Sequence, residues 1–164
     1  MGMILYHGSY IAIEKPDIQY ARLKTDFGRG FYLTPHREQA LRWSARFLRS
    51  RGSAAISVYS FLPEPARMPK EARILEFDAH NLDWLNFITS CRLGQATDDA
   101  WDLIIGGVAN DKVFDTLQLY FDRLLSADEA IGRLRYDKPN LQYCFKTQAF
   151  IDEFLQFMTA EVLP

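Results

Sequence analysis

Near its N-terminus the chain reads Leu5-Tyr6-His7-Gly8-Ser9, and shortly afterwards Asp26-Phe27-Gly28-Arg29-Gly30-Phe31-Tyr32-Leu33-Thr34. Each stretch is typical of a strand that carries one polar ring, with glycines where a ligand can approach the backbone closely. Residues of this kind do not build a hydrophobic core by themselves. We therefore interpret the two stretches as parts of one binding site, with a nucleotide as its ligand.

The expected nucleotide is NAD. Glycine at position 8 lets a flat ligand reach a backbone N–H and C=O that lie side by side, and a carboxamide such as that of nicotinamide pairs with one of each. Strand alternation places Phe31 and Leu33 on one face and Tyr32 on the other, where its ring can stack on a ligand. The alternatives are a structural histidine at position 7 and an amphipathic surface tyrosine at position 32.

The loop 26–30 is not a dinucleotide fingerprint, because it lacks a third glycine and leads into a strand rather than a helix. Asp26 is expected either to cap this turn or to bind near Gly30 so that Tyr32 is correctly aimed. Arg29, held between two glycines, is placed to reach a pyrophosphate. The alternative for the whole loop is a turn or bulge before a strand.

Gln142 lies on the last predicted strand, where its amide can hydrogen-bond a ribose hydroxyl or simply face solvent. The proposed site then has two overlapping sets of residues. The expected catalytic residues are Tyr32, Gln142 and His7, and the expected NAD-binding residues are His7, Gly8, Ser9, Asp26, Gly28, Arg29, Gly30 and Tyr32.

The composition fits one globular domain over residues 1–164, because a chain that is 48% hydrophobic and 14% aromatic can fill a core of this size. The net charge of −2 gives no strong field toward nucleic acid or membrane. Arginines crowd the predicted helix 35–51, either as a solvated face or as a patch for phosphate or an acidic partner.

Two cysteines give no disulfide framework, and three histidines in unrelated contexts give no zinc site, so we expect no metal. The N-terminus does not have the pattern of a signal peptide, and no window approaches the ~20 apolar residues of a membrane span. A cytoplasmic protein is the expectation, with secretion as an effector as the alternative.

The pattern of the chain predicts an α+β fold with a bent or split sheet flanked by helices. Strands are expected at 3–7, 30–34, 54–62, 73–77, 102–107 and 141–146. Helices are expected at 35–51, ended by Gly52; at 82–92, capped by Asn81 or Asp83; after Asn110 or Asp111; after the capping box Ser126–Glu129; and, following a turn at Pro139-Asn140, from Thr147 through Met158.

These positions, in this order, resemble the ADP-ribosyltransferase superfamily, and within it the bacterial family DUF3990. The stretches 104–111 and 142–147 look like later blocks of that family. The resemblance implies a split β core that binds NAD in a bent conformation. Carried over, His7 holds the adenosine ribose, Gly8 clamps the carboxamide and Tyr32 stacks on nicotinamide. The third position is often glutamate and here is Gln142, a His-Tyr-Gln variant of the His-Tyr-Glu branch.

The resemblance implies a mono-ADP-ribosyltransferase that cleaves NAD and modifies a macromolecular acceptor, as a toxin or effector neutralised by a partner protein. An amide at position 142 can accept a hydroxyl hydrogen bond but cannot act as a base, so we expect single transfer rather than chain elongation. Two alternatives remain: a non-catalytic module that binds NAD or another nucleotide, and an NAD glycohydrolase with water as the acceptor.

Overall fold

The protein has an α+β fold, as the sequence predicts. A computed structural model describes residues 2–63, 68–95, 100–109, 111–134 and 140–164. The strands are β1 (Met3–Ser9), β2 (Phe31–Leu33), β3 (Ala54–Phe61), β4 (Ile74–Glu76), β5 (Leu103–Val108), β6 (Asn140–Phe145) and β7 (Leu155–Leu163). The helices are the short 3-10 turn η1 (Ile18–Tyr20), α1 (Arg37–Arg51), α2 (Leu82–Arg92), α3 (Asp111–Phe121), α4 (Ala127–Leu134) and α5 (Gln148–Phe154).

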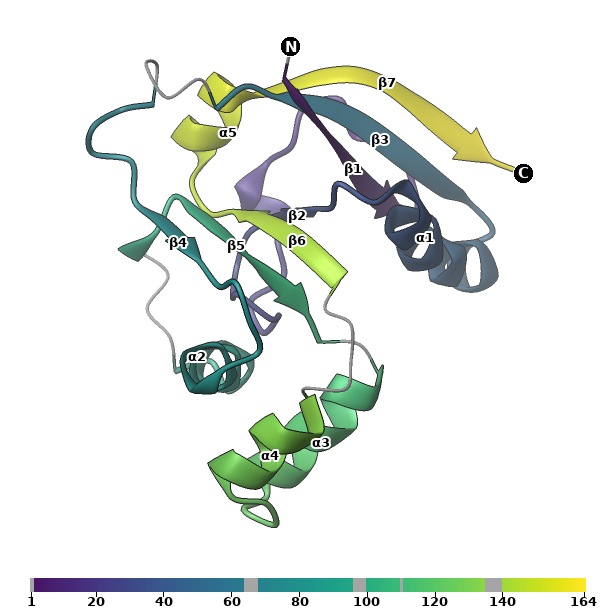
Figure 1. Cartoon of the computed structure of the whole chain (residues 1–164). Helices are drawn as coiled ribbons and strands as arrows, with labels where there is room; N and C mark the ends of the chain where they lie inside the picture. Colours follow the sequence, from purple (N-terminus) through teal and green to yellow (C-terminus); the bar gives the residue numbers. More distant parts are fainter. Residues whose placement is uncertain (1, 64–67, 96–99, 110, 135–139) are drawn as a thin grey trace.

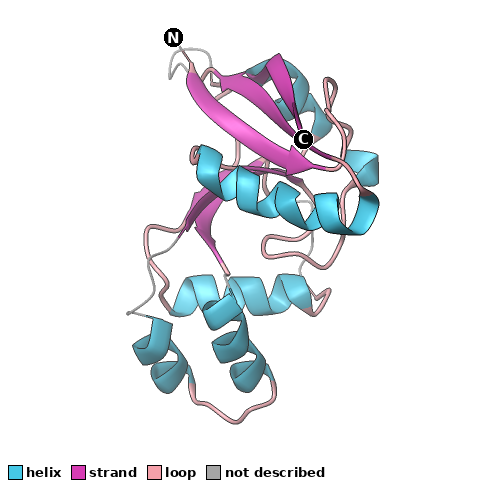
Figure 2. Ribbon diagram, turned by 90° about the vertical axis from the view of Figure 1, so that its right-hand side faces the viewer, coloured by secondary structure: helices cyan, strands magenta, loops and turns pink. Residues whose placement is uncertain are grey.

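The strands form two sheets. One is three-stranded in the order β1-β3-β7, and the other is four-stranded in the order β2-β6-β5-β4. All pairings are antiparallel except that of β4 with β5. Figure 1 shows the two sheets with α1 beside β1 and β3, and with α2, α3 and α4 gathered at the far end of the four-stranded sheet. Figure 2 shows α1 lying across the first sheet, well apart from α2, α3 and α4.

Strand alternation gives the four-stranded sheet two apolar faces. Leu103 and Phe145 point into a core shared with the other sheet and with α5, whereas Ile104 and Cys144 point into a second core with α2, α3 and α4. The buried members of the first core are Leu5, Phe31, Leu33, Tyr59, Phe61, Leu103, Tyr143, Phe145, Phe150, Ile151 and Phe154. Tyr32 packs against the second core, on the face opposite to its neighbours Phe31 and Leu33, as alternation predicts.

The two sheets meet at one isolated antiparallel bridge between Tyr6 of β1 and Thr34, directly after β2. These residues exchange both backbone hydrogen bonds, with N···O distances of 2.8 and 2.9 Å. Backbone groups alternate in direction along a strand, so the N–H and C=O of Gly8 also point to the side of β2, while those of His7 point toward β3. Among the described residues no second bridge joins β1 to β2, so the strands separate beyond Tyr6.

Local signals explain three of the helix ends. Gly52 ends α1 in the left-handed conformation (φ 73°), and the Asn81 side chain caps α2 by accepting from the Trp84 N–H. The capping box is also confirmed, because Ser126 and Glu129 exchange backbone-to-side-chain hydrogen bonds at the start of α4. Asn110 and Pro139, a predicted cap and a predicted turn, lie outside the described residues.

The prediction for the C-terminal helix is partly wrong. Helix α5 ends at Phe154, and Leu155 begins β7, so Met158 lies on a strand. Thr147 is the N-cap residue of α5, as predicted, but its hydroxyl forms no capping hydrogen bond and donates instead to the carboxylate of Asp102. The edge of β3 explains the difference, because it pairs with 155–163 except at Met158, where the register shifts, and there Phe157 packs against Tyr59.

In the described part of the chain no helix is long and apolar enough to cross a membrane. Cys91 and Cys144 are buried thiols that form no disulfide with each other.

Candidate functional site

The separation of β1 from β2 creates the first half of the candidate site. Continued from the bridge at Tyr6 and Thr34, an antiparallel ladder would place Gly8 opposite Tyr32. Instead the C=O of Tyr32 accepts a hydrogen bond from Nδ1 of His7, at 2.7 Å. No hydrogen bond joins the backbone of Gly8 to β2 within the described residues. The N–H and C=O of Gly8 are therefore left beside each other where the strands part.

His7 is held in one tautomer. A carbonyl oxygen only accepts, so Nδ1 carries the proton and Nε2 of the neutral ring is an acceptor. Burial lowers the pKa of His7 below its ordinary value of 6.5, and the hydrogen bond to Tyr32 partly opposes this shift. The half-buried ring also stacks on Phe31, with centroids 4.3 Å apart. Near neutral pH His7 thus offers a fixed lone pair.

The lowered pKa predicts acid lability. Below pH 6.5 His7 binds a proton in the unfolded chain but remains neutral in the folded protein. The free energy of unfolding should therefore fall as the pH falls. The loss should level off once the pH lies below the folded pKa. Urea denaturation between pH 7.5 and 4.5 measures this, and His7→Asn should flatten the curve, whereas the exposed His36→Asn should not. Parallel curves for all three proteins would contradict it.

Gly8 is also required by packing. An ideal Cβ at this position would lie 2.3 Å from the C=O oxygen of Ala40 and 3.1 Å from the N of Ser44, both in α1. Glycine therefore lets α1 lie directly on β1. Packing also requires glycine at position 30, because a Cβ there would lie 2.2 Å from the sulfur of Cys144. Close packing thus explains two of the glycines that the sequence assigned to ligand binding.

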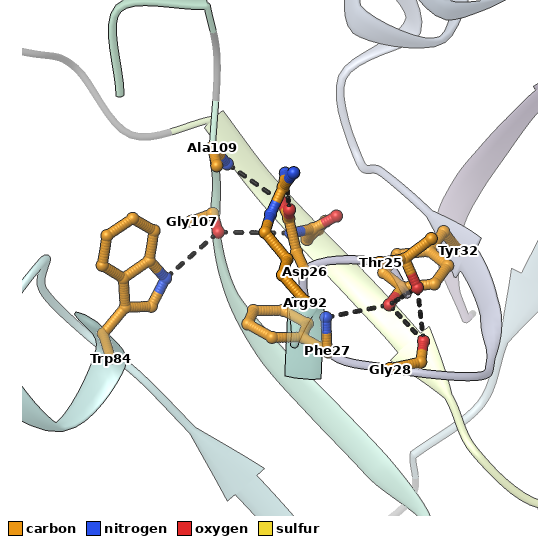
Figure 3. Close-up of polar contacts among 10 residues, drawn as sticks. Thr25, Asp26, Phe27, Gly28, Tyr32, Trp84, Arg92, Gly107 and Ala109 are labelled. Atoms are coloured by element: carbon orange, nitrogen blue, oxygen red, sulfur yellow. Dashed lines mark hydrogen bonds and ion pairs between the residues drawn. The ribbon is translucent and has the colours of Figure 1, made fainter. Parts of the chain in front are cut away.

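The hydroxyl of Tyr32 fixes the loop before β2. It donates to the C=O of Gly28 (2.6 Å), accepts from the N–H of Phe27 (2.9 Å) and lies 2.8 Å from the hydroxyl of Thr25 (Figure 3). Gly28 takes the left-handed conformation (φ 75°), which favours glycine in this turn. Burial raises the pKa of Tyr32 well above its usual value, so the phenol stays protonated and remains a donor.

Removing this hydroxyl should loosen the turn. We expect Tyr32→Phe to lower the free energy of unfolding by about 1–2 kcal/mol, because the Phe27 N–H and the Gly28 C=O lose a partner. Tyr20 is 87% exposed, so Tyr20→Phe is the matched control and should change little. Denaturation measures the stability, and faster hydrogen exchange at Phe27 locates the change. Equal effects of the two substitutions would argue against the role of the hydroxyl.

Asp26 organises the second half of the site. Its carboxylate is almost fully buried, forms an ion pair with Arg92 of α2, and accepts hydrogen bonds from the N–H of Ala109 (3.0 Å) and Nε2 of Gln142 (3.1 Å). The same Nε2 donates to the C=O of Gly107, at 3.2 Å. Figure 3 shows Asp26 and Arg92 on one side of this cluster and Tyr32 on the other, with the loop 25–28 between them.

The structure brings most of the expected residues together. Asp26 and Gly28 belong to the loop 25–28, where Gln142 binds Asp26 and Tyr32 binds Gly28. His7 contacts the same cluster through the C=O of Tyr32. Gln142 is 2% exposed, so it does not simply face solvent. Arg29 is directed elsewhere, because its Nε donates to the C=O of Ile18 in η1. Ser9, at the end of β1, is buried.

Several residues of this cluster carried no signal in the sequence. Arg92 stands in the last turn of a helix, where a basic residue is ordinary. The C=O of Gly107 accepts from both Gln142 and the indole of Trp84. Every residue has such a backbone carbonyl, so the residue type does not indicate this role. Thr25 directly precedes the stretch 26–34 and is not among the residues that the sequence predicts for the site. In the described part of the chain no group of three or more His, Cys, Asp or Glu is arranged to hold a metal ion.

Two hollows of the described surface lie away from these residues. One is formed by residues 14–19 with α5, and the other lies between α2, α3 and α4. Gly8 is buried and His7 and Tyr32 are half-buried. A ligand that reaches the backbone of Gly8 therefore has to open the separation between β1 and β2 further.

The chain belongs to the DUF3990 family. The model of this family, described as a protein of unknown function (DUF3990), matches residues 3–157, which is almost the whole chain. No curated protein and no solved structure matches it significantly.

Proposed function

We propose that this member of the DUF3990 family is a mono-ADP-ribosyltransferase that binds NAD where β1 and β2 separate. The observation that carries the proposal is the pair of backbone groups of Gly8, which point to β2 without a partner there. One donor beside one acceptor matches the carboxamide of nicotinamide. Next to them, the neutral Nε2 of His7 matches a ribose hydroxyl, which can donate to it.

The roles of Tyr32 and Gln142 follow from their contacts. The hydroxyl of Tyr32 is engaged by the loop 25–28, so only its ring is available to a ligand, in accord with stacking on nicotinamide. The amide nitrogen of Gln142 is engaged by Asp26 and Gly107, so its carbonyl oxygen is the group left for a hydroxyl of the nicotinamide ribose. Gln142 then orients the ribose rather than removing a proton.

These roles fit a transfer of ADP-ribose in which the orientation of bound NAD provides most of the catalysis. The bond between nicotinamide and the ribose breaks, nicotinamide leaves with the electron pair, and the anomeric carbon develops positive charge. An acceptor nucleophile bonds to that carbon and loses its own proton to solvent or to a base of the acceptor. Holding the carboxamide and the ribose fixed lowers the barrier without a general base. An amide at position 142 suits one transfer to a nucleophilic macromolecule, with a neutralising protein as a further partner.

The burial of Gln142 also supports a second candidate, a module that binds NAD without cleaving it. A side chain that is 2% exposed and tied to Asp26 through its amide can serve the cluster alone. In that case His7 and Gly8 bind the nucleotide, and a partner protein recognises the NAD-bound form of the module.

Incubation with labelled NAD and a total cell lysate separates these functions. The site variant is His7→Asn, because the asparagine amide can keep the hydrogen bond to the Tyr32 C=O while Nε2 is lost. His36→Asn, on the surface at the start of α1, is the matched control. Label fixed to a macromolecule by wild type and control, but tenfold less by His7→Asn, supports the transferase. Saturable binding of intact NAD supports the module, and free ADP-ribose indicates a glycohydrolase. Equal labelling by all three proteins would contradict the site.

A further inference from the structure

We infer that Asp26 and Arg92 are positioning residues for Gln142, and that the carboxylate of Asp26 is the reason why position 142 holds an amide. Asp26 binds the nitrogen of this amide and thereby turns its carbonyl oxygen to the substrate. The catalytic part of this inference rests on the proposed function. The pairing itself does not, because it is a property of the folded protein.

The contacts leave one orientation of the amide. Nε2 of Gln142 lies 3.1 Å from a carboxylate oxygen of Asp26 and 3.2 Å from the C=O of Gly107. Both of these groups only accept, so the NH₂ group must face them. The carbonyl oxygen of Gln142 points away from both, and no hydrogen bond to it is formed by the part of the chain that the structure describes.

A glutamate at position 142 would not fit this environment. Its carboxylate would meet the carboxylate of Asp26 and the oxygen of Gly107 at hydrogen-bond distance, with no proton between them. Like charges at this separation in a buried site cannot both persist, so one carboxyl group would take up a proton or the loop would move away. Gln142 is therefore matched to Asp26, and the common glutamate is excluded here by a neighbour distant in sequence.

Arg92 and Ala109 hold Asp26 in place. The guanidinium of Arg92 forms an ion pair with the carboxylate, and the N–H of Ala109 fixes the oxygen that also receives Gln142. The guanidinium lies 5.0 Å from the centre of the Phe114 ring, so α3 also supports it. Through these contacts the loop 25–28, α2 and β5 together set the angle of one side chain on β6.

The geometry offers an exchange of the two partners. In the double variant Asp26→Asn with Gln142→Glu, the asparagine NH₂ group can donate to the new carboxylate where it replaces the oxygen shared by Ala109 and Gln142, so the N–H of Ala109 loses its acceptor. The number of charges in the cluster is unchanged, and the asparagine oxygen takes the place of the oxygen that pairs with Arg92. The hydrogen bond between positions 26 and 142 is restored with reversed polarity, whereas Gln142→Glu destroys it and Asp26→Asn weakens it by replacing a charged acceptor with an amide oxygen.

The test compares wild type with Asp26→Asn, Gln142→Glu and the double variant. We expect Gln142→Glu to lower the thermal midpoint most, and the double variant to regain part of that loss, since the N–H of Ala109 stays without its acceptor. For NAD turnover by the folded proteins, we expect kcat to fall at least fivefold in Asp26→Asn and tenfold in Gln142→Glu. KM should change less than twofold, because His7 and Gly8 are untouched. The side-chain NH₂ resonances of Gln142 should shift and exchange faster in Asp26→Asn.

The outcomes separate the two proposals. If wild type does not turn over NAD, the proposed function fails, while the midpoints and NH₂ resonances still decide the pairing. Unchanged stability in Gln142→Glu, or a double variant no better than that single variant, would overturn the pairing. Loss of stability with kcat unchanged in Asp26→Asn would show that the pairing holds the fold together but does not position Gln142 for catalysis.

Discussion

Replacing Arg92 with methionine is expected to lower the free energy of unfolding by about 3–5 kcal/mol. The carboxyl side chain of Asp26 is only 8% exposed and faces Arg92, so the substitution leaves a buried charge without its countercharge. Methionine keeps an unbranched apolar stem beside Phe114, which limits the loss of packing. Urea denaturation at neutral pH measures the change, with the slope of the transition showing whether unfolding stays two-state.

A second ion pair, between residues that directly precede β4 and β5, provides the control. Arg73 pairs with Asp102 at 3.1 Å, but its side chain is 49% exposed, so Arg73→Met should cost about 1 kcal/mol or less. Adding Asp26→Asn to Arg92→Met should recover part of the larger loss, since the buried charge is then gone. A loss below 1 kcal/mol for Arg92→Met, with no recovery in the double variant, would mean that water reaches Asp26 and the ion pair matters little.

The sequence predicts local structure well wherever one residue sets the backbone. Gly52 ends α1, and the box at Ser126 and Glu129 starts α4, because both signals act within a few residues. The segment after Phe154 is different. Its apolar residues at 154, 155 and 158 fit a helix as well as an irregular strand, and the unpaired edge of β3 decides between them. Such an edge exists only once β1 and β3 have paired.

In the candidate site, too, features set by neighbouring residues are predictable and those set by distant residues are not. Alternation predicts that Tyr32 points away from Phe31 and Leu33, and the structure confirms this. The partners of Asp26 could not be predicted, because Arg92 lies 66 residues away and Gln142 lies 116 residues away along the chain. The sequence alone predicts a turn role for Asp26 and does not connect it with Gln142. A buried carboxylate needs donors, but the sequence does not say which donors the fold supplies.

The last prediction concerns Gly8, where packing and ligand binding make different demands. We expect Gly8→Ala to lower the free energy of unfolding by about 3 kcal/mol, because its Cβ would lie 2.3 Å from the backbone oxygen of Ala40. A backbone atom inside a helix cannot swing aside, so α1 and β1 must move apart. Gly132→Ala is the matched control, since its Cβ meets nothing within 4 Å, and it should stabilise α4 by about 0.5–1 kcal/mol.

Binding of NAD to the folded variants then distinguishes the two demands on Gly8. A shift of β1 away from α1 moves the N–H and C=O that we propose to hold the carboxamide, so Gly8→Ala should weaken NAD binding at least tenfold at a temperature where it is still folded. Calorimetric titration beside Gly132→Ala measures this. Lost stability with unchanged affinity would mean that glycine is kept at position 8 for helix packing alone. Lost affinity in a protein that remains folded would support a ligand at the point where β1 leaves β2, since the atoms nearest to this Cβ belong to α1 and not to β2.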